Sequence, residues 1–278
     1  MIRLRSLGDC VLTTPALALL KNHRPDLKIT VIIEPQFAAI FEGNPDVDEI
    51  RKDACAADLA LNLHGGTQSM RMTLASRAKY RVGFGHHAWS VLYTHKIPRA
   101  QEILGEERVV HTAEHLASAM FWLGVPISQV PRAKLFADPP PRWDPYAIVH
   151  PFAAVANRVW PPERFVEVIE GIRGLEPIVI AGPHDDVSPF KKYRLLHNQP
   201  LDQVKRIISG AAVLIGNNSG PAHIAAAFGV PAVVVFDPPS VASWSPWRAE
   251  SQVLPDLDRV TPADVLAALR LLMKETHA

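Results

Sequence analysis

The chain has 278 residues, of which 48% are hydrophobic and 21% are charged, and its formal net charge is +1. This length is long for one domain and comfortable for two, and the composition excludes a globally disordered chain. A charge balance this close to zero disfavours a nucleic-acid partner, because proteins that bind nucleic acids are usually strongly basic.

The cysteine content indicates the compartment. Two cysteines, Cys10 and Cys55, exclude a disulfide framework and favour a reducing cytoplasm. Cysteine and histidine show no metal-binding spacing, so we predict no metal site. The sequence has no uninterrupted run of about 18 apolar residues, and its first residues are typical of a strand rather than of a cleavable signal. We therefore expect a cytoplasmic protein without a membrane span.

The first half of the chain alternates predicted strands with predicted helices. Apolar runs predict strands at 1–4, 28–33, 47–51, 59–63 and 80–84, and helical periodicity predicts helices at 11–22, 37–41, 68–78 and 111–123. Residues 86–108 show no clear period, and we expect an irregular segment near a cleft. This alternation is typical of parallel βαβ units in an open, doubly wound sheet.

A proline-rich stretch at 138–145 divides the chain, because proline at this density continues neither a helix nor a strand. We predict domains at 1–140 and 141–278. The second half restarts the alternation, with strands at 146–150, 177–181, 213–215 and 232–236 and helices at 162–172, 201–209, 223–228 and 261–274. We expect Asp258 or Thr261 to cap the last helix, and this helix can pack either in its own domain or back on the first domain. The predicted fold is α/β, with two doubly wound domains facing a cleft.

The segment 213–238 is the most informative stretch for function. A buried strand is followed by the loop GNNSG at 216–220, by a helix with Pro221 near its first position, and by a second buried strand. Free backbone N–H groups at a helix N-terminus suit a phosphate, although Asn or Ser in such a loop also serves as a simple helix cap. Neither a GxGxxG nor a GxxxxGK[ST] motif is present, so the common nucleotide loops do not explain this segment.

Ligands of open α/β sheets bind beyond the carboxyl ends of the strands. The loops expected there are 6–9, 64–66, 151–158, 182–186 and 216–220. Asp9 is either a helix cap or a general base aimed into the cleft. Arg158 is either a solvated side chain or a clamp for a diphosphate. His223 is either an ordinary helix residue or a donor to a phosphate oxygen.

The aromatic and histidine residues outside these loops have simpler interpretations. His86, His87 and His95 lack the i, i+4 spacing and the nearby carboxylate of a metal site, so we interpret them as structural or substrate-lining. Trp244 and Trp247 are expected to pack at the cleft edge.

Four stretches together resemble the bacterial lipopolysaccharide heptosyltransferases, glycosyltransferase family 9. RLRSLGDCVLTTPAL at 3–17 is similar to the family's opening motif, and RVWPPERF at 158–165 is similar to its Lys-x-Trp-Pro-x-Glu-x-Phe segment. AGPHD at 181–185 resembles its Gly-Gly-Pro turn. GNNSGPAH at 216–223 resembles its Asn-Asp-Ser-Gly-Pro-x-His motif, with 236–246 as the continuation. Their order and spacing cover nearly the whole chain.

The resemblance implies a GT-B fold with two Rossmann-like domains, the acceptor on the first and the nucleotide-sugar donor on the second. It implies inverting, metal-independent transfer of heptose from ADP-heptose to a lipopolysaccharide core acceptor, with no cofactor and with Asp9 as general base. The donor diphosphate and sugar would be bound by Arg158, Asn218, Ser219, Gly220 and His223, and the nucleotide by Gly182, Pro183, Asp185 and Asn217; the acceptor side would comprise Gly8, Thr13, His64 and Gly65.

The sequence departs from the family pattern at the donor loops. Asn218 stands where the family usually has Asp, Arg158 replaces the usual Lys, and Ala153 and Ala154 occupy a loop that often supplies hydroxyls. The alternatives are a GT-B transferase for another nucleotide sugar or acceptor, and an inactive sugar-nucleotide-binding homologue.

The acceptor class also implies a location. A lipid A-type acceptor implies a protein, expected to be a monomer, that acts peripherally at the inner face of the inner membrane. The patch Arg71, Arg77, Lys79 and Arg81 is either the contact or a solvated charged surface.

Overall fold

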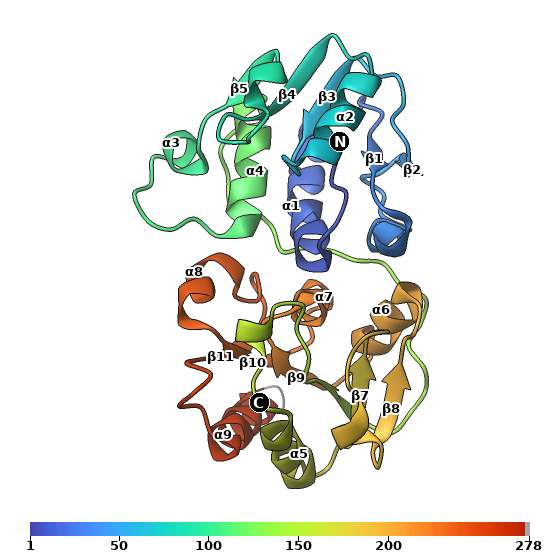
Figure 1. Cartoon of the computed structure of the whole chain (residues 1–278), viewed down its shortest axis with the longest axis vertical. Coiled ribbons are helices and arrows are strands. Elements are labelled where there is room, and N and C mark those ends of the chain that lie inside the picture. Colours follow the sequence, from blue (N-terminus) through green and yellow to red (C-terminus); the bar gives the residue numbers. More distant parts are fainter. Residues whose placement is uncertain (276–278) are drawn as a thin grey trace. The chain divides into compact units, whose positions relative to one another are not determined.

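The computed structural model describes residues 1–275 and divides the chain into two compact units, Met1–Phe136 and Ala137–Ala278 (Figure 1). The division falls between residues 136 and 137, within four residues of the boundary predicted at 140. In the described part of the chain, no helix is both long and apolar enough to cross a bilayer.

The first unit is built on a parallel sheet whose centre is the chain's own N-terminus. Its strands are β1 (Thr30–Ile32), β2 (Glu49–Arg51), β3 (Leu59–Asn62), β4 (Tyr80–Phe84) and β5 (His95–Ile97). β1 pairs with β2, and β3, β4 and β5 pair in that order. Ile2 joins these two groups through parallel bridges to Ile32 and Asn62. The N-terminal segment therefore lies in the middle of the sheet, as the first strand does in doubly wound folds, although it forms only these bridges and not the strand predicted at 1–4.

Helices cover this sheet on its two faces. They are α1 (Leu7–His23), α2 (Thr67–Ala75), α3 (Ala100–Leu104) and α4 (Thr112–Trp122), with short 3-10 turns η1 (Pro35–Ile40) and η2 (Ser90–Leu92). α1 packs side by side with α4 (Figure 1). The prediction of an irregular segment at 86–108 was wrong, since η2, β5 and α3 lie within it. α1 also begins four residues before the predicted position, so Asp9 lies in its first turn.

The second unit repeats the same strand order. Its strands are β6 (Tyr146–His150), β7 (Glu176–Ala181), β8 (Arg194–His197), β9 (Val213–Asn217), β10 (Ala232–Phe236) and β11 (Ser251–Pro255). All pairs are parallel, in the order β11-β10-β9-β6-β7-β8. The first and fourth strands, β6 and β9, are therefore neighbours, and the topological switch point lies between their carboxyl ends.

The helices of the second unit are α5 (Pro162–Gly171), α6 (Leu201–Ser209), α7 (Gly220–Phe228), α8 (Val241–Trp244) and α9 (Pro262–Glu275), with 3-10 turns η3 (Ala156–Arg158), η4 (Ser188–Phe190) and η5 (Pro238–Ser240). α5 and α9 pack on one face of the sheet, where Val149, Ile215, Val235 and Leu272 form a buried core with Trp160. Residues pointing to the other face are equally buried, where α7 packs on β9 and β10.

The ends of two helices follow the sequence signals. α7 begins at Gly220 with Pro221 in its first turn and ends at Gly229, whose φ of 76° is the left-handed conformation that glycine adopts without strain. Thr261 directly precedes α9 and exchanges hydrogen bonds with Asp264 in a capping arrangement. α9 packs on α5, β10 and β11 of its own unit.

Candidate functional site

An ion pair lies at the switch point of the first unit. Arg3 is buried next to Ile2, where its guanidinium donates to the Leu63 carbonyl at 2.5 Å and pairs with the Asp9 carboxylate. The Asp9 side chain is 20% exposed. Ser6 occupies the N-cap of α1 and its side chain makes no capping hydrogen bond, and the Asp9 carboxylate is engaged by Arg3 instead of by helix N–H groups. Asp9 is not the N-cap residue, because α1 begins before it, but it lies in the first turn of that helix, where a carboxylate interacts favourably with the helix dipole.

The chain enters α1 through an unusual backbone conformation. Ser6 has a φ of 71°, a left-handed value that costs a non-glycine residue energy and persists only where its surroundings impose it. Gly8 and Thr13, predicted on the acceptor side, are both buried in α1, and the Thr13 hydroxyl donates to the Asp9 carbonyl at 2.8 Å. These two residues shape the helix that carries Asp9 and do not present side chains to solvent.

The loop after β3 approaches the same edge of the sheet, because its Leu63 carbonyl accepts from Arg3. Asn62 organises this loop: its side-chain oxygen accepts the N–H groups of His64 and Gly65, each at 3.0 Å. Burial, with Arg3 and Arg5 nearby, lowers the pKa of His64 to about 4. His64 is therefore a neutral imidazole at physiological pH, suited to hydrogen bonding rather than to binding anions through charge.

His86 and His87 form an aromatic cluster with His115. The His115 ring stacks on Phe84 with centroids 4.1 Å apart, and His86 lies 5.1 Å from His87. Burial lowers the pKa of both His87 and His115 to about 4. His95 lies outside this cluster, 5.7 Å from the Tyr80 ring.

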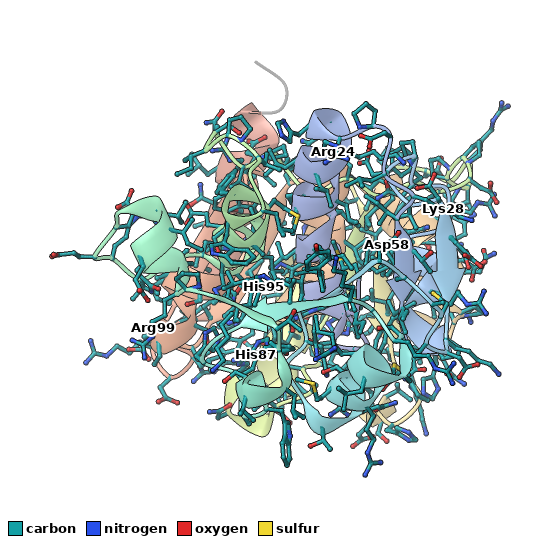
Figure 2. All side chains as sticks on the ribbon, turned by 90° about the horizontal axis from the view of Figure 1, so that it is seen from above. Arg24, Lys28, Asp58, His87, His95 and Arg99 are labelled. Atoms are coloured by element: carbon teal, nitrogen blue, oxygen red, sulfur yellow. The ribbon has the colours of Figure 1, made fainter. Side chains whose placement is uncertain are left out.

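The cluster borders the predicted acceptor side. The His87 ring occupies the space beside Gly65, where an added Cβ would come within 2.5 Å of it. In Figure 2, His87 lies on the side of the first unit away from Arg24 and Lys28, which precede β1. No group of three or more His, Cys, Asp or Glu side chains in the part of the chain that the structure describes could hold a metal ion.

The switch point of the second unit is braced by Asn217, at the end of β9. Its side-chain oxygen accepts the Trp160 N–H at 3.0 Å, and its amide donates to the Pro151 carbonyl at 2.9 Å. The side chain is fully buried. Asn217 was predicted on the nucleotide side, but both polar atoms of its side chain hold protein backbone.

The loop that follows has the free donors of an anion site. Ser219 is the N-cap of α7, yet its hydroxyl lies 3.0 Å from His150 Nδ1 and 3.1 Å from the Asn217 carbonyl, so it does not cap the helix. Within the described residues, the backbone N–H groups of Ser219 and Gly220 donate to no acceptor. Burial lowers the pKa of His150 to about 4, with Asp185 opposing the effect. Two uncommitted N–H groups thus lie beside a neutral histidine at a helix N-terminus, where an anion is favoured.

Asp237, which the sequence analysis did not select, connects the predicted donor residues. It follows β10 directly, and its carboxylate lies 3.6 Å from Arg158 Nε, 3.4 Å from the Asn218 amide and 2.5 Å from the Ser240 hydroxyl. Its position at the carboxyl end of a predicted strand was the available signal.

The remaining predicted donor residues also lie in the second unit, where they contact other parts of the protein. The Gly182 N–H donates to the Asp185 carboxylate at 2.7 Å, which closes the turn containing Pro183. His223 is buried in α7, with its ring 6.0 Å from Trp244. The second unit therefore brings Arg158, Asn218, Ser219 and Gly220 to the loops around its switch point, while Asp185 and His223 have protein contacts of their own.

Comparison with solved structures shows the fold of the protein. The structure of a family 9 glycosyltransferase from Veillonella parvula DSM 2008 aligns with a TM-score of 0.86 at 20% identity, over 99% of this chain and 96% of that one. The structure of Escherichia coli ADP-heptose lipopolysaccharide heptosyltransferase II aligns with a TM-score of 0.83 at 17% identity, over 100% and 98%. The protein has the GT-B fold of these glycosyltransferases, as predicted.

The sequence identifies the family. Residues 50–258 match the model for glycosyltransferase family 9 (heptosyltransferase). Lipopolysaccharide heptosyltransferase 3 of Escherichia coli K12 is 25% identical, over 96% of this chain and 96% of that protein. The chain belongs to glycosyltransferase family 9 and is an enzyme of that class.

Proposed function

We propose that the protein transfers a heptose from ADP-heptose to a lipopolysaccharide core acceptor, with inversion and without a metal ion, and that Asp9 is the general base. The family and the names of the related heptosyltransferases support the substrate class. The observation that carries the assignment of the base is the position of Asp9, a partly exposed carboxylate held by buried Arg3 at the switch point of the first unit.

The proposed reaction is a single displacement. The acceptor hydroxyl oxygen attacks the anomeric carbon of the donor sugar while the bond from that carbon to the diphosphate oxygen breaks. Asp9 takes the hydroxyl proton as the new glycosidic bond forms, and ADP leaves with the bonding electron pair. Attack opposite the leaving group inverts the anomeric configuration. Because Arg3 fixes the carboxylate, the base is oriented before the acceptor arrives.

The second unit would stabilise the negative charge that develops on the leaving diphosphate. The free N–H groups of Ser219 and Gly220 at the start of α7 are suited to phosphate oxygens. The side chain of Arg158 is half-buried, and its contact with Asp237 is a loose one at 3.6 Å, so a diphosphate could replace that contact with shorter, charge-assisted hydrogen bonds. This arrangement supplies the positive charge that a divalent ion provides in other transferases.

Asn218 is an integral part of this arrangement. Its amide donates to Asp237 at 3.4 Å, and an aspartate in its place would put two carboxylates at that distance. Two like charges so close would repel each other and would repel the donor phosphates. We therefore interpret the departure from the family pattern at 218 as compatible with an active enzyme, because Asn218 and Asp237 together form a hydrogen-bonded pair carrying one negative charge.

The other predicted residues have supporting roles in this proposal. The turn containing Gly182, Pro183 and Asp185 would border the nucleotide, and His223 would support the diphosphate loop from within α7. On the acceptor side, His64 and Gly65 would border the sugar that is attacked.

The decisive experiment compares Asp9→Asn with Asp26→Asn. Asp26 is also ion-paired, to Arg24 at 2.6 Å, but both side chains are exposed. Asp9→Asn should abolish transfer to a heptose-deficient core acceptor while calorimetry still shows ADP binding, and Asp26→Asn should change neither. Circular dichroism establishes that each variant is folded. Transfer by Asp9→Asn at the wild-type rate would exclude Asp9 as the base.

Donor identity and metal independence are tested in the same assay. Binding of ADP and ADP-heptose, but not of UDP-sugars, in buffer containing EDTA supports the proposal. Preference for a UDP-sugar would indicate the alternative transferase, and ADP-heptose binding by the wild type without transfer to any core acceptor would indicate an inactive homologue. The proposal also expects a monomer that acts at the inner face of the inner membrane, which sedimentation velocity and cell fractionation test.

A further inference from the structure

His150 contacts the donor loop of the second unit, although the sequence analysis did not select it. It is the last residue of β6 and lies opposite Gly216 of β9 in the parallel register. A Cβ on Gly216 would lie 2.7 Å from the His150 carbonyl oxygen, so the close approach of these two residues requires glycine at 216. The imidazole packs edge-on against Phe152, with ring centroids 6.0 Å apart. Its Nδ1 lies 3.0 Å from the hydroxyl of Ser219.

Two partners hold the Ser219 hydroxyl. It lies 3.1 Å from the Asn217 carbonyl, which can only accept, so the hydroxyl proton is donated there. Burial lowers the pKa of His150 to about 4, and the neutral imidazole carries one N–H group. The hydroxyl oxygen therefore accepts this N–H from Nδ1. Both the proton and a lone pair of the hydroxyl are thus engaged away from the helix that Ser219 precedes.

Without these partners the hydroxyl would have another use. A serine at the N-cap ordinarily accepts an N–H group of the second or third helical residue through its hydroxyl. In α7 the second residue is Pro221, which has no N–H, and the third is Ala222, whose N–H donates to the Ser219 carbonyl at 3.2 Å. A rotation about the Cα–Cβ bond would bring the Ser219 hydroxyl to this N–H. The hydroxyl would then lie across the N-terminus of α7, in front of the N–H groups of Ser219 and Gly220.

We propose that His150 is a positioning residue, which holds the Ser219 hydroxyl aside and thereby keeps the N-terminus of α7 open for the diphosphate of the donor. The inference rests on the proposed function, in which the N–H groups of Ser219 and Gly220 bind that diphosphate. A side-chain cap and a phosphate compete for one helix end, because both interact with its N–H groups and its positive dipole. His150 removes this competition before the donor arrives and needs no contact with the donor itself.

The experiment compares ADP binding by variants of the full-length protein in calorimetry. His150→Phe keeps an aromatic ring beside Phe152 but has no N–H group. It should weaken ADP binding roughly fivefold, which corresponds to a capping hydrogen bond of ordinary strength that must break before the phosphate binds. His150→Asn supplies an amide N–H in place of Nδ1 and should bind ADP within about twofold of the wild type. His197→Phe is the matched control, because His197 is exposed at the end of β8, and it should not change the affinity.

A second substitution distinguishes positioning from direct contact. If the released hydroxyl blocks the helix end, Ser219→Ala in the His150→Phe background should strengthen ADP binding at least about threefold. If the hydroxyl itself contacts the phosphate, the same substitution should weaken binding further, and if His150 only supports the fold, it should leave the loss unchanged. Either of these two results would overturn the inference. In the transfer assay, His150→Phe should raise the KM for the donor with kcat nearly unchanged, because the cap stabilises only the enzyme without donor.

Circular dichroism and urea unfolding of the C-terminal unit establish that each variant is folded. His150→Leu, which also lacks a donor, repeats the comparison if the phenyl ring does not fit. ADP binding that both variants leave at the wild-type level would overturn this inference and leave the proposed function standing. A wild type that binds no ADP would overturn the proposed function and this inference together.

Discussion

Replacing Arg3 by methionine removes the guanidinium that holds both the Asp9 carboxylate and the Leu63 carbonyl. Removing one partner of a buried ion pair typically costs about 3 to 5 kcal/mol, because the other charge is left without compensation. Asp9 is 20% exposed, so we take the lower end, about 3 kcal/mol. Asp9→Asn should cost a similar amount, since burial already lowers the pKa of Arg3 to about 10 and the cation would then lack its counter-charge.

The double variant Arg3→Met, Asp9→Asn separates this pairing from simple packing. Removing both charges eliminates the uncompensated group, so the double variant should be more stable than either single variant. The expected coupling free energy is at least about 2 kcal/mol. With a urea dependence of about 2 kcal/mol per molar, a loss of about 3 kcal/mol shifts the midpoint by about 1.5 M.

The assay is urea unfolding followed by circular dichroism at neutral pH. The two units should give separable transitions, and the transition of the C-terminal unit should not move in any of these variants. Transfer by Arg3→Met should show a lower kcat with little change in the KM for the donor, because in the proposed mechanism Arg3 positions the base and the second unit binds the nucleotide. Additive single-variant effects, with a coupling below about 0.5 kcal/mol, would refute the reasoning.

Three further predictions concern the second unit and the histidines. Gly216→Ala would place a Cβ 2.7 Å from the His150 carbonyl oxygen, so it should separate β6 from β9 and weaken ADP binding at least about tenfold by calorimetry; unchanged affinity would contradict this packing. Asn218→Asp should weaken ADP binding more than about tenfold at pH 7.5 through repulsion from Asp237, with partial recovery at lower pH; equal or tighter binding would refute the single-charge pair. In the folded protein, burial lowers the pKa of His64, His87, His115 and His150 to about 4. In the unfolded chain these histidines take up protons as the pH falls below about 6.5, so their full contribution to the free energy of unfolding should be present above pH 6.5 and should be lost progressively toward pH 4. Each contributes a slope of up to about 1.4 kcal/mol per pH unit, and His115→Gln should reduce the slope measured by urea unfolding between pH 7 and pH 5; an unchanged slope would show that His115 is protonated equally in both states.

The strands that sequence reasoning located to the residue are β4, β6 and β10, each of which pairs with a strand on both of its sides. β6 and β10 are also apolar and buried along almost their whole length, as central parallel strands usually are, whereas β4 begins with the exposed Tyr80. β5, β8 and β11 were missed because they lie at sheet edges, where one side of the strand is unpaired. Their sequences, HKI, RLLH and SQVLP, mix polar and apolar residues without a clear alternation. Whether such a segment becomes an edge strand depends on the strand with which it pairs, and the local sequence carries no information about that partner.

For the candidate site, sequence reasoning located the loops but did not establish what each side chain in them contacts. The rule that ligand loops follow the carboxyl ends of strands selected Asp9, Arg158 and the loop 216–220, and the same rule applied to the strand at 232–236 would have selected Asp237. Whether a polar side chain in such a loop faces a ligand or holds the backbone is decided by tertiary neighbours. Asn217 illustrates this, because its two hydrogen bonds reach Trp160 and Pro151, 57 and 66 residues away in the chain.

The two units use one physical solution at their switch points. In the first unit, Arg3, next to Ile2, donates to the Leu63 carbonyl just after β3. In the second unit, Asn217 at the end of β9 donates to the Pro151 carbonyl just after β6. The first and fourth strands diverge into loops on opposite faces, so backbone carbonyls at this point lose their ladder partners and need a side-chain donor. Each brace lies just before a helix whose first turn carries the proposed chemistry: Asp9 in α1, and Ser219 and Gly220 at the start of α7. Changes in the braces should therefore impair the site more than substitutions among the loop residues that keep charge, such as the lysine to arginine difference at Arg158.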